Sequence, residues 1–419
     1  MSSILLVLAD DLTGAIDTGV QFASKGISTI VIHDIKLAHS LPTDPQVIII
    51  NTQTRNSSKD DAYVLISKVL SMIKKANITY IYKKTDSGLR GNVGAELQAV
   101  MDSYPNGVLA FAPAYPDTGR TVINGRLFID GLPVSQSVFG RDPFKPVRFD
   151  CVSDIIHAQT QLKIVDSKDP QAFSQGIITL FDSISFLDLQ EAAKEASLHS
   201  VALFAGCAGF AESLISCLPL ISRPTVHISL SSPSLFISGS ISEITFKQIN
   251  YALAHGLHEI MIEPVSLLTD NFVTTSQGSC CISRTVELIR EQGAALISAA
   301  KSSLEAELVY TFGSASGLSL ENIKTIISRN LGQLLYGIYS VMPYVIPVIF
   351  GGDTLSQVLH AFKTIAIHPI CEVERGTVLS QVTCKEGSLF LVSKSGSFGD
   401  TQSIARIRAF VSGLGKCQT

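Results

Sequence analysis

The sequence predicts an α/β protein of two domains, each with a mainly parallel sheet flanked by helices, and with an antiparallel β-meander inserted in the N-terminal domain. Three observations predict it. Short apolar runs recur, each followed by a turn of small or polar residues and then by apolar residues at helical spacing. A chain of 419 residues is long for one hydrophobic core. Two dipeptides between apolar runs, Asn124-Gly125 and Asp130-Gly131, are hairpin signals.

Composition narrows the classes of function. The net charge is −4, Trp is absent and aromatic residues make up 7%, so neither charge nor base stacking favours nucleic acid. The apolar N-terminal run at 4–8 lacks preceding basic residues and predicts a strand rather than a signal peptide. The most apolar long run, 331–350, contains Pro343 and Pro347 and predicts a helix and a strand rather than a membrane span. We therefore expect a cytoplasmic protein with no nucleic-acid or membrane partner.

The run at 4–8 is the first predicted strand, and acidic residues follow it. Asp10, Asp11 and Asp17 lie within eight residues and repel one another unless a cation or substrate hydroxyls lie between them. The carboxyl ends of parallel strands are where α/β sheets place ligands. One of the three acids is expected to cap the next helix, and the alternative is that Asp11 or Thr13 does no more than cap it.

Two further strand ends carry polar residues. Arg55 follows the apolar run 47–50 and suits a carboxylate, although a surface arginine is the alternative. The strand predicted at 78–82 leads into Lys83-Lys84-Thr85-Asp86-Ser87-Gly88-Leu89-Arg90, and a helix with Asn92 as a candidate N-cap and Glu96 in its first turn comes next. Cations for a carboxylate, with Asp and Ser/Thr for hydroxyls, predict a site for a small polyhydroxy acid.

A Ser/Pro-rich stretch near 222–233 marks the predicted domain boundary. Beyond it, strands are expected at 235–237, 259–262, 308–312, 345–350 and 389–392, and helices at 243–255, 285–303 and 320–339. Glycine- and serine-rich turns should follow four of the strands, at 238–240, 313–317, 351–354 and 394–399. Such turns along one edge of a parallel sheet can bind a polyphosphate and a ribose, although none is a Walker or GxGxxG sequence.

The turn at 351–354, Gly-Gly-Asp-Thr, is the most informative of these. Adjacent glycines let backbone N–H groups approach an anion, and a helix N-terminus follows. Asp353 in such a place either holds magnesium or takes a proton from an attacking hydroxyl. The alternative is an ordinary strand-to-helix turn in which Asp353 or Thr354 is the N-cap.

Taken together, the motifs resemble the four-carbon acid sugar kinases. The resemblance covers nearly the whole chain, in family order, with Gly88 a departure at a position where small residues vary. Its stretches are ADDLTGA at 9–15 with DTG at 17–19, KKTDS at 83–87 with LRGN at 89–92, APA at 112–114 with GRT at 119–121 and NG at 124–125, RDP at 141–143, SGS at 238–240, GGDT at 351–354, and KSG at 394–396 with FGD at 398–400.

The resemblance implies a sugar-acid substrate domain at 1–222 and a nucleotide-binding domain at 234–419. It implies that the γ-phosphate of ATP, with Mg²⁺, is transferred to the terminal hydroxyl of threonate, erythronate or a 3-oxo relative. By family likeness Asp11, Arg55 and residues 84–87 contact the substrate, and Ser238, residues 351–354 and Gly396 contact ATP. A homodimer is compatible with this family.

Residues and resemblance combine into one expected site under two closing domains. Expected at the substrate are Asp10, Asp11, Arg55, Lys83, Lys84, Thr85, Asp86, Ser87 and Arg90. Expected at the nucleotide are Ser238, Gly239, Ser240, Gly351, Gly352, Asp353, Thr354, Lys394, Ser395 and Gly396. Asp353 is the first choice for the catalytic base and Asp86 the second, and no magnesium ligand is assigned. The rival function is a non-catalytic sugar-acid or nucleotide sensor, and a nicotinamide dehydrogenase lacks its fingerprint.

Overall fold

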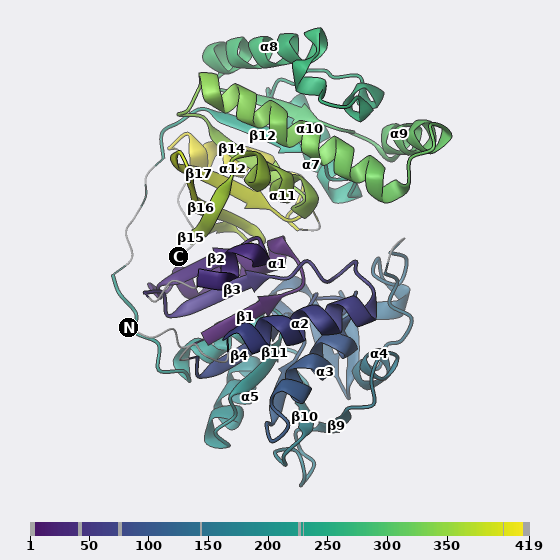
Figure 1. Cartoon of the computed structure of the whole chain (residues 1–419), viewed down its shortest axis with the longest axis vertical. Coiled ribbons are helices and arrows are strands. Elements are labelled where there is room, and N and C mark those ends of the chain that lie inside the picture. The colour runs from purple at the N-terminus through teal and green to yellow at the C-terminus, as the bar shows by residue number, and fades with distance from the viewer. Residues whose placement is uncertain are drawn as a thin grey trace. The chain divides into compact units, whose positions relative to one another are not determined.

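The computed structural model describes residues 5–40, 44–73, 78–142, 145–224, 228, 230–396 and 398–413. Ile4, Pro143 and Ser397, which belong to predicted segments, lie outside these ranges. The chain divides into two compact units, residues 1–225 and 226–419, and each is described by itself (Figure 1).

The first unit is built on a parallel sheet in the order β2-β3-β1-β4-β11-β5-β10-β9. Its strands are β1 (Leu5–Ala9), β2 (Thr29–Ile32), β3 (Val47–Asn51), β4 (Tyr80–Lys84), β5 (Leu109–Ala112), β9 (Lys163–Asp166), β10 (Ile177–Leu180) and β11 (Leu203–Gly206). β1 and β3 are buried along their whole length, as expected for parallel strands with helices on both faces.

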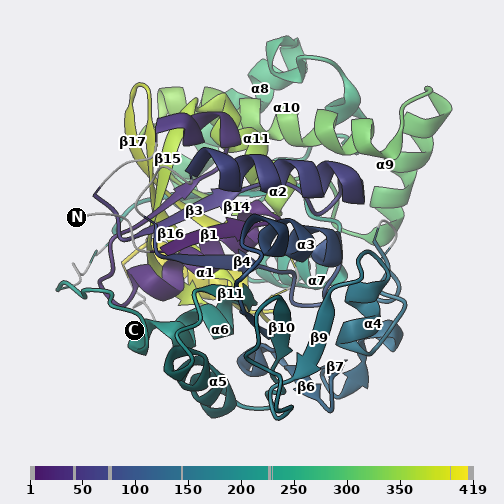
Figure 2. The ribbon, with the colours of Figure 1, turned by 60° about the horizontal axis from the view of Figure 1, so that its bottom comes forward.

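Helices cover this sheet in two groups. α2 and α3 run side by side, with α4 against α3, while α1 and α5 pack against α6 (Figure 2). Their bounds are α1 (Leu12–Ala23), α2 (Lys59–Ile73), α3 (Val93–Ser103), α4 (Val152–His157), α5 (Phe186–Leu198) and α6 (Ala208–Ser213).

The predicted β-meander is confirmed as a separate antiparallel sheet of β6 (Arg120–Ile123), β7 (Arg126–Ile129) and β8 (Leu132–Pro133). Its two turns are the predicted dipeptides. Asn124 and Gly125 have φ of 49° and 69°, and Asp130 and Gly131 have φ of 50° and 80°. Two consecutive left-handed residues match the twist of the flanking strands.

The second unit has the sheet order β13-β12-β14-β17-β16-β15. Pairs from β13 to β17 are parallel, and β17-β16 and β16-β15 are antiparallel. The strands are β12 (Ser234–Ser238), β13 (Ala294–Ser298), β14 (Ile346–Phe350), β15 (Thr364–Glu374), β16 (Thr377–Cys384) and β17 (Gly387–Lys394). The helices are α7 (Glu243–Ala254), α8 (Ser276–Gln292), α9 (Ser303–Ala315), α10 (Leu320–Val341), α11 (Gly352–Ala361) and α12 (Ser403–Val411). Phe236, Val348 and Phe350 lie in its core.

Three predictions for the second unit are wrong. The helix expected at 285–303 ends at Gln292, because Gly293 adopts φ 71° as its C-cap and β13 follows. The strand expected at 308–312 is part of α9, because the Ser302 side chain accepts a hydrogen bond from the Glu305 N–H and starts a helix there. The strand expected at 259–262 is reduced to one bridge between Glu259 and Leu296.

The third glycine- and serine-rich turn is therefore displaced. Residues 313–317 close α9 and do not follow a strand. The segment that does follow a strand is 299–302, after β13. No helix in the parts of the chain that the structure describes has the length and apolar character needed to cross a membrane.

Candidate functional site

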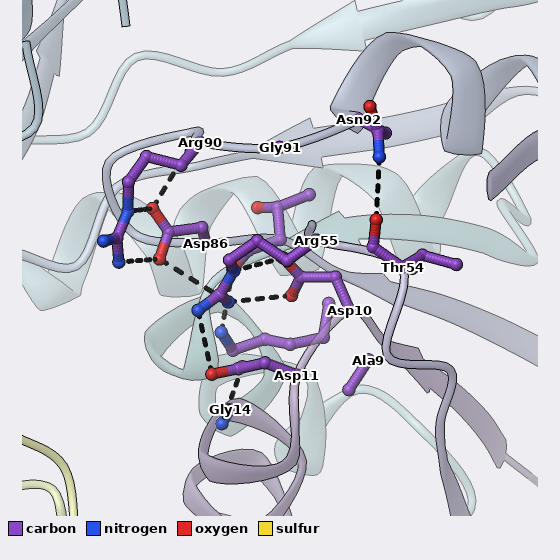
Figure 3. Close-up of polar contacts among 12 residues, drawn as sticks. Ala9, Asp10, Asp11, Gly14, Thr54, Arg55, Asp86, Arg90, Gly91 and Asn92 are labelled. Carbon is purple, nitrogen blue, oxygen red and sulfur yellow. Dashed lines mark hydrogen bonds and ion pairs between the residues drawn. The ribbon is translucent and has the colours of Figure 1, made fainter. Parts of the chain in front are cut away.

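Three neighbouring strands of the first unit bring their carboxyl ends to one edge. The register pairs Ala9 of β1 with Asn51 of β3 and with Lys84 of β4. The residues that follow, Asp10, Thr52 and Thr85, therefore start from the same level of the sheet. Figure 3 shows the side chains of Asp10, Asp11, Arg55 and Asp86 directed toward one another at this edge.

Arg55 is the centre of the cluster. Its Nε donates to Asp10 Oδ2 at 2.7 Å and its Nη2 to Asp10 Oδ1 at 3.0 Å. Its Nη1 donates to Asp11 Oδ2 at 2.8 Å, and Asp86 Oδ1 lies 3.5 Å from Nη2. Burial alone would lower the pKa of Arg55, but the three carboxylates raise it well above its usual value. The surface-arginine alternative is therefore wrong.

Asp11 caps α1 and also binds Arg55. Its Oδ1 accepts from the Gly14 N–H at 2.9 Å and its Oδ2 from Thr13 Oγ1 at 2.6 Å. Burial would raise the pKa of Asp11, but Arg55 and Lys84 outweigh it and hold the pKa below its usual value. The carboxylate stays ionised, with 23% of its side chain exposed.

Asp86 is held by its own turn. It accepts from Arg90 Nε at 2.8 Å and Nη2 at 2.9 Å, and from the backbone N–H of Gly88 at 3.1 Å and of Arg90 at 3.2 Å. Arg90 Nη1 also donates to Asp142 at 2.9 Å. Burial would raise the pKa of Asp86, but Arg90 and Arg55 hold it far below its usual range. A carboxylate stabilised so strongly as an anion is a poor proton acceptor.

The two lysines of β4 lie on opposite faces of the sheet, because side chains alternate along a strand. Lys84 Nζ donates to Thr85 O at 2.8 Å and lies on the Asp11 side, where a Cβ on Gly14 would be 3.1 Å from it. Burial would lower the pKa of Lys84, but Cys207, Asp10 and Asp17 raise it.

Lys83 is fully buried and pairs with Glu96 of α3 at 2.9 Å. Its Nζ also donates to Lys84 O at 2.7 Å and Leu8 O at 3.2 Å. Thr54 Oγ1 donates to the same glutamate. Burial raises the pKa of Glu96, and Lys83 opposes this rise. Through Glu96, Lys83 is therefore connected to Thr54 in the loop that carries Arg55.

Asn92 is the N-cap residue of α3 and Glu96 lies in its first turn, as predicted. The Asn92 side chain makes no capping bond to α3. Its Nδ2 donates instead to Thr54 O at 2.7 Å and Ser57 O at 2.9 Å. Both residues therefore fix the loop around Arg55. Thr85 is buried and donates its backbone N–H to Gly206 O at 2.9 Å, and Ser87 is partly exposed.

Sequence reasoning gave no role to Arg120 or Phe139. Arg120 belongs to a family-like stretch, and the charges of Asp130, Asp86 and Arg90 act on it. Two guanidinium groups lie over the Phe139 ring, with Cζ of Arg90 at 4.8 Å and Cζ of Arg120 at 5.7 Å from its centroid. Arg120 lies in the family-like stretch at 119–121, which could have indicated a role at the site, whereas nothing in the sequence singles out Phe139.

The second unit gathers its predicted turns at one sheet edge. The register aligns Ser238 with both Ser298 and Phe350, and Phe350 with Lys394. The turns after β12, β13, β14 and β17 therefore begin side by side. The predicted segments 238–240, 351–354 and 394–396 are brought together, and 299–302 takes the place of 313–317.

Close backbone approach explains the glycines. A Cβ on Gly239 would collide with Thr354 Oγ1, and one on Gly396 would lie 2.6 Å from Ser240 Oγ. Gly351 has φ 95° and donates its N–H to Lys394 O at 3.2 Å. It is also the N-cap of α11, so the alternative in which Asp353 or Thr354 caps this helix is wrong. Small residues leave the helix N-terminus open to an anion.

Asp353 lies in the first turn of α11 and is exposed, while Thr354 is buried. No ion pair of Asp353 is found among residues 5–413 as far as the structure describes them. Its charge acts on Tyr310 of α9 and raises the pKa of that phenol, second to burial. Within the same described ranges, no group of three or more His, Cys, Asp or Glu side chains could hold a metal ion.

Lys394 is 1% exposed, and backbone carbonyls hold its ammonium group. Its Nζ donates to Phe398 O at 2.8 Å and Ser395 O at 3.1 Å, and lies 5.3 Å from the Phe350 ring centroid. Burial lowers the pKa of Lys394 to about 8, with Glu374 opposing the shift.

This burial predicts a pH dependence of stability. The pKa of Lys394 is about 8 in the folded chain and about 10.5 when unfolded. Between these two pH values the unfolded chain binds more protons at Lys394 than the folded chain does. The free energy of unfolding should therefore rise with pH across this window, by up to roughly 3 kcal/mol. Lys394→Met should lose this rise, and urea unfolding of both chains across the window measures it. The same slope in the variant would contradict a depressed pKa at this lysine.

Two protein-family models match this chain, one in each compact unit. Residues 5–214 match the family model of a sugar-binding N-terminal domain, and residues 235–404 match that of a nucleotide-binding C-terminal domain. The two domains define a class of carbohydrate kinases. The chain belongs to the four-carbon acid sugar kinase family.

Of three relatives named as kinases, two match nearly the whole chain. A D-threonate kinase of Salmonella typhimurium is 26% identical over 421 residues, covering 96% of each chain. A 3-oxo-tetronate kinase of Pseudomonas fluorescens is 24% identical and covers 94% of each. A D-erythronate kinase of Heliobacterium modesticaldum is 28% identical over 59% of this chain and 60% of its own length.

Solved structures share the fold. A Salmonella typhimurium LT2 protein gives a TM-score of 0.75 at 20% identity, covering 96% of this chain and 98% of its own. A Haemophilus influenzae protein of the DUF1537 family gives 0.70 at 18% identity, covering 97% and 100%. The predicted α/β fold class is confirmed.

Proposed function

We propose that this protein is an ATP-dependent kinase that phosphorylates the terminal hydroxyl of a four-carbon sugar acid (threonate, erythronate or a 3-oxo-tetronate) to the 4-phosphate. The observation that carries the proposal is the cluster of Asp10, Asp11, Arg55, Lys84 and Asp86 at one sheet edge. A cluster that mixes cations with ionised carboxylates offers partners for both ends of a polyhydroxy acid.

Within this cluster, Arg55 and Lys84 hold the substrate carboxylate, and Asp11 accepts from a substrate hydroxyl. Asp11 and Arg55 keep 23% and 17% of their side chains exposed, so substrate can reach them. Two acidic residues, Asp10 and Asp86, keep Arg55 in place. The turn after β4 is shaped by Thr85 and Arg90, and in the same turn Ser87 offers a hydroxyl group to the substrate. Lys83, fully buried on Glu96, supports the Arg55 loop rather than contacting substrate.

The glycine turn of the second unit takes the ATP phosphates. Backbone N–H groups at 352–354, at the N-terminus of α11, favour negative charge there, while the Gly351 N–H is already donated to Lys394 O. Ser238, Gly239 and Ser240 form the adjoining turn, and Lys394 holds the turn that follows β17 through the carbonyl groups of Ser395 and Phe398. Mg²⁺, when bound with ATP, would neutralise charge on the phosphate oxygens, and it would take most of its ligands from phosphate and water.

Asp353 is the better candidate for the base. Asp86 accepts four hydrogen bonds from Arg90 and its own turn, and its pKa lies far below the usual range. Asp353 is exposed beside the glycine turn. Phosphoryl transfer needs an aligned hydroxyl and a proton acceptor within reach of the γ-phosphate.

Gly351→Ala should raise KM for ATP about tenfold and leave KM for the sugar acid within twofold. An L side chain at φ 95° is strained by roughly 1–3 kcal/mol, which distorts the phosphate-binding turn. Gly317→Ala is the matched control, since Gly317 has φ 82° and open space around it but ends α9. Equal effects of both variants on KM for ATP would contradict the proposed phosphate site.

The direct test is ATP consumption with a panel of four-carbon acids, including both enantiomers of threonate and erythronate and their 3-oxo relatives. We expect acid-dependent ADP release with at least one of them. Binding of the acid or of ATP without turnover across the panel would instead indicate a sensor.

A further inference from the structure

Gly88 stands in the turn that carries Asp86 and Arg90, and Phe139 fills the space where its side chain would be. A Cβ on Gly88 would lie 2.5 Å from Cγ and 2.6 Å from Cδ1 of the Phe139 ring. The backbone of Gly88 is outside the left-handed region, so alanine would meet no backbone strain there. The three atoms nearest to such a Cβ all belong to the Phe139 ring, so the ring requires glycine at this position.

Phe139 belongs to the loop that follows the β-meander and is 4% exposed. Its backbone carbonyl accepts from Val147 N–H at 3.1 Å, which fixes the loop. The guanidinium of Arg90 lies over its ring at 4.8 Å, a contact that attracts a cation to the aromatic face. The same guanidinium makes two hydrogen bonds to Asp86, at 2.8 and 2.9 Å.

Two arginines contact Asp86, so the position of Arg90 affects that of Arg55. Asp86 Oδ1 accepts a hydrogen bond from Arg90 Nη2 at 2.9 Å and lies 3.5 Å from Arg55 Nη2. If Arg90 moved away, the buried carboxylate would draw Arg55 toward itself, since an unpaired buried charge is costly. Arg55 would then leave Asp10 and Asp11.

We propose that Phe139 is a positioning residue for the sugar-acid site: it locks Arg90 onto Asp86 and thereby keeps Arg55 on Asp10 and Asp11. The inserted β-meander region thus sets the affinity for the acid without contacting it. This inference rests on the proposed function of the cluster.

Phe139→Ala should raise KM for the acid about tenfold, with KM for ATP within twofold. Phe139→Leu, which keeps apolar bulk but has no aromatic face, should raise it about threefold. Phe181→Ala is the matched control, because Phe181 is equally buried in the same unit and packs on Phe173. An unchanged KM for the acid in Phe139→Ala, or an equal rise in Phe181→Ala, would overturn the inference.

A second measurement tests the contact without any substrate. Gly88→Ala should lower the Tm of the full chain by about 3–10 °C, the effect of overpacking a core. In the Phe139→Ala background, the same change should cost almost nothing, so the two substitutions are non-additive. An additive double variant would refute the Gly88–Phe139 contact.

The two failures can be told apart. If the wild-type chain phosphorylates no acid in the panel, the proposed function fails, while the thermal cycle still reports on Gly88 and Phe139. If the chain is active and Phe139→Ala keeps the wild-type KM for the acid, the inference alone fails.

Discussion

Asp353→Asn should lower kcat by about 10²–10⁴-fold, the usual contribution of a general base. The amide keeps the size of the side chain but cannot take a proton from the attacking hydroxyl. Because Asp353 is exposed and in the first turn of α11, the fold should tolerate the change, with Tm within about 2 °C of wild type. Steady-state kinetics with saturating ATP and acid measures the effect.

The control is Asp86→Asn, which removes the second candidate. Its carboxylate is buried and bound to Arg90 and Arg55, so this variant should lose stability and affinity for the acid together. Near-wild-type kcat in Asp353→Asn would remove Asp353 from the role of base. A selective loss of kcat in a stable Asp86→Asn would transfer the role to Asp86.

Arg55→Ala should raise KM for the acid by about 30- to 1000-fold, because losing one partner of a buried charge network costs roughly 2–4 kcal/mol. Asp10, which is 3% exposed, would lose its two bonds to the guanidinium. We also expect a lower Tm for Arg55→Ala. The variant Arg55→Lys should recover part of the stability but little of the affinity for the acid, because an ammonium group cannot bridge two carboxylates as the planar guanidinium does. Isothermal titration with the acid and a thermal scan separate the two effects.

Arg329→Ala is the matched control for this variant. Arg329 pairs with Asp270 at 2.7 Å, but Asp270 is 82% exposed, and an exposed pair contributes little. It should leave KM for the acid and Tm nearly unchanged. If Arg55→Ala bound the acid as tightly as wild type, the acid would have to bind elsewhere.

The edge that carries the candidate substrate site was predictable because parallel strands end at the same level. Once runs at 4–8, 47–50 and 78–82 are taken as parallel strands of one sheet, Asp10, Arg55 and Asp86 must follow strand ends at the same edge of that sheet. The alternation of side chains along a strand also predicts that Lys83 and Lys84 lie on opposite faces of the sheet, so the expectation that both contact the substrate was avoidable.

Other features depend on contacts far apart in sequence. Which carboxylate Arg55 would bind is decided by the order of β3, β1 and β4 in the sheet, and Phe139 reaches Arg90 only through the inserted meander and loop. The mistake at 308–312 arose because a β-branched and aromatic run favours a strand, while the cap at Ser302 commits the segment to a helix.

The most direct test is a crystal structure of the protein with a non-hydrolysable ATP analogue and a four-carbon acid that supports turnover. We predict the phosphates on the backbone N–H groups of residues 352–354, in the 351–354 turn, and the acid between Asp11, Arg55 and Lys84. A nucleotide lodged away from this glycine turn, or an acid that leaves Arg55 untouched, would contradict the account.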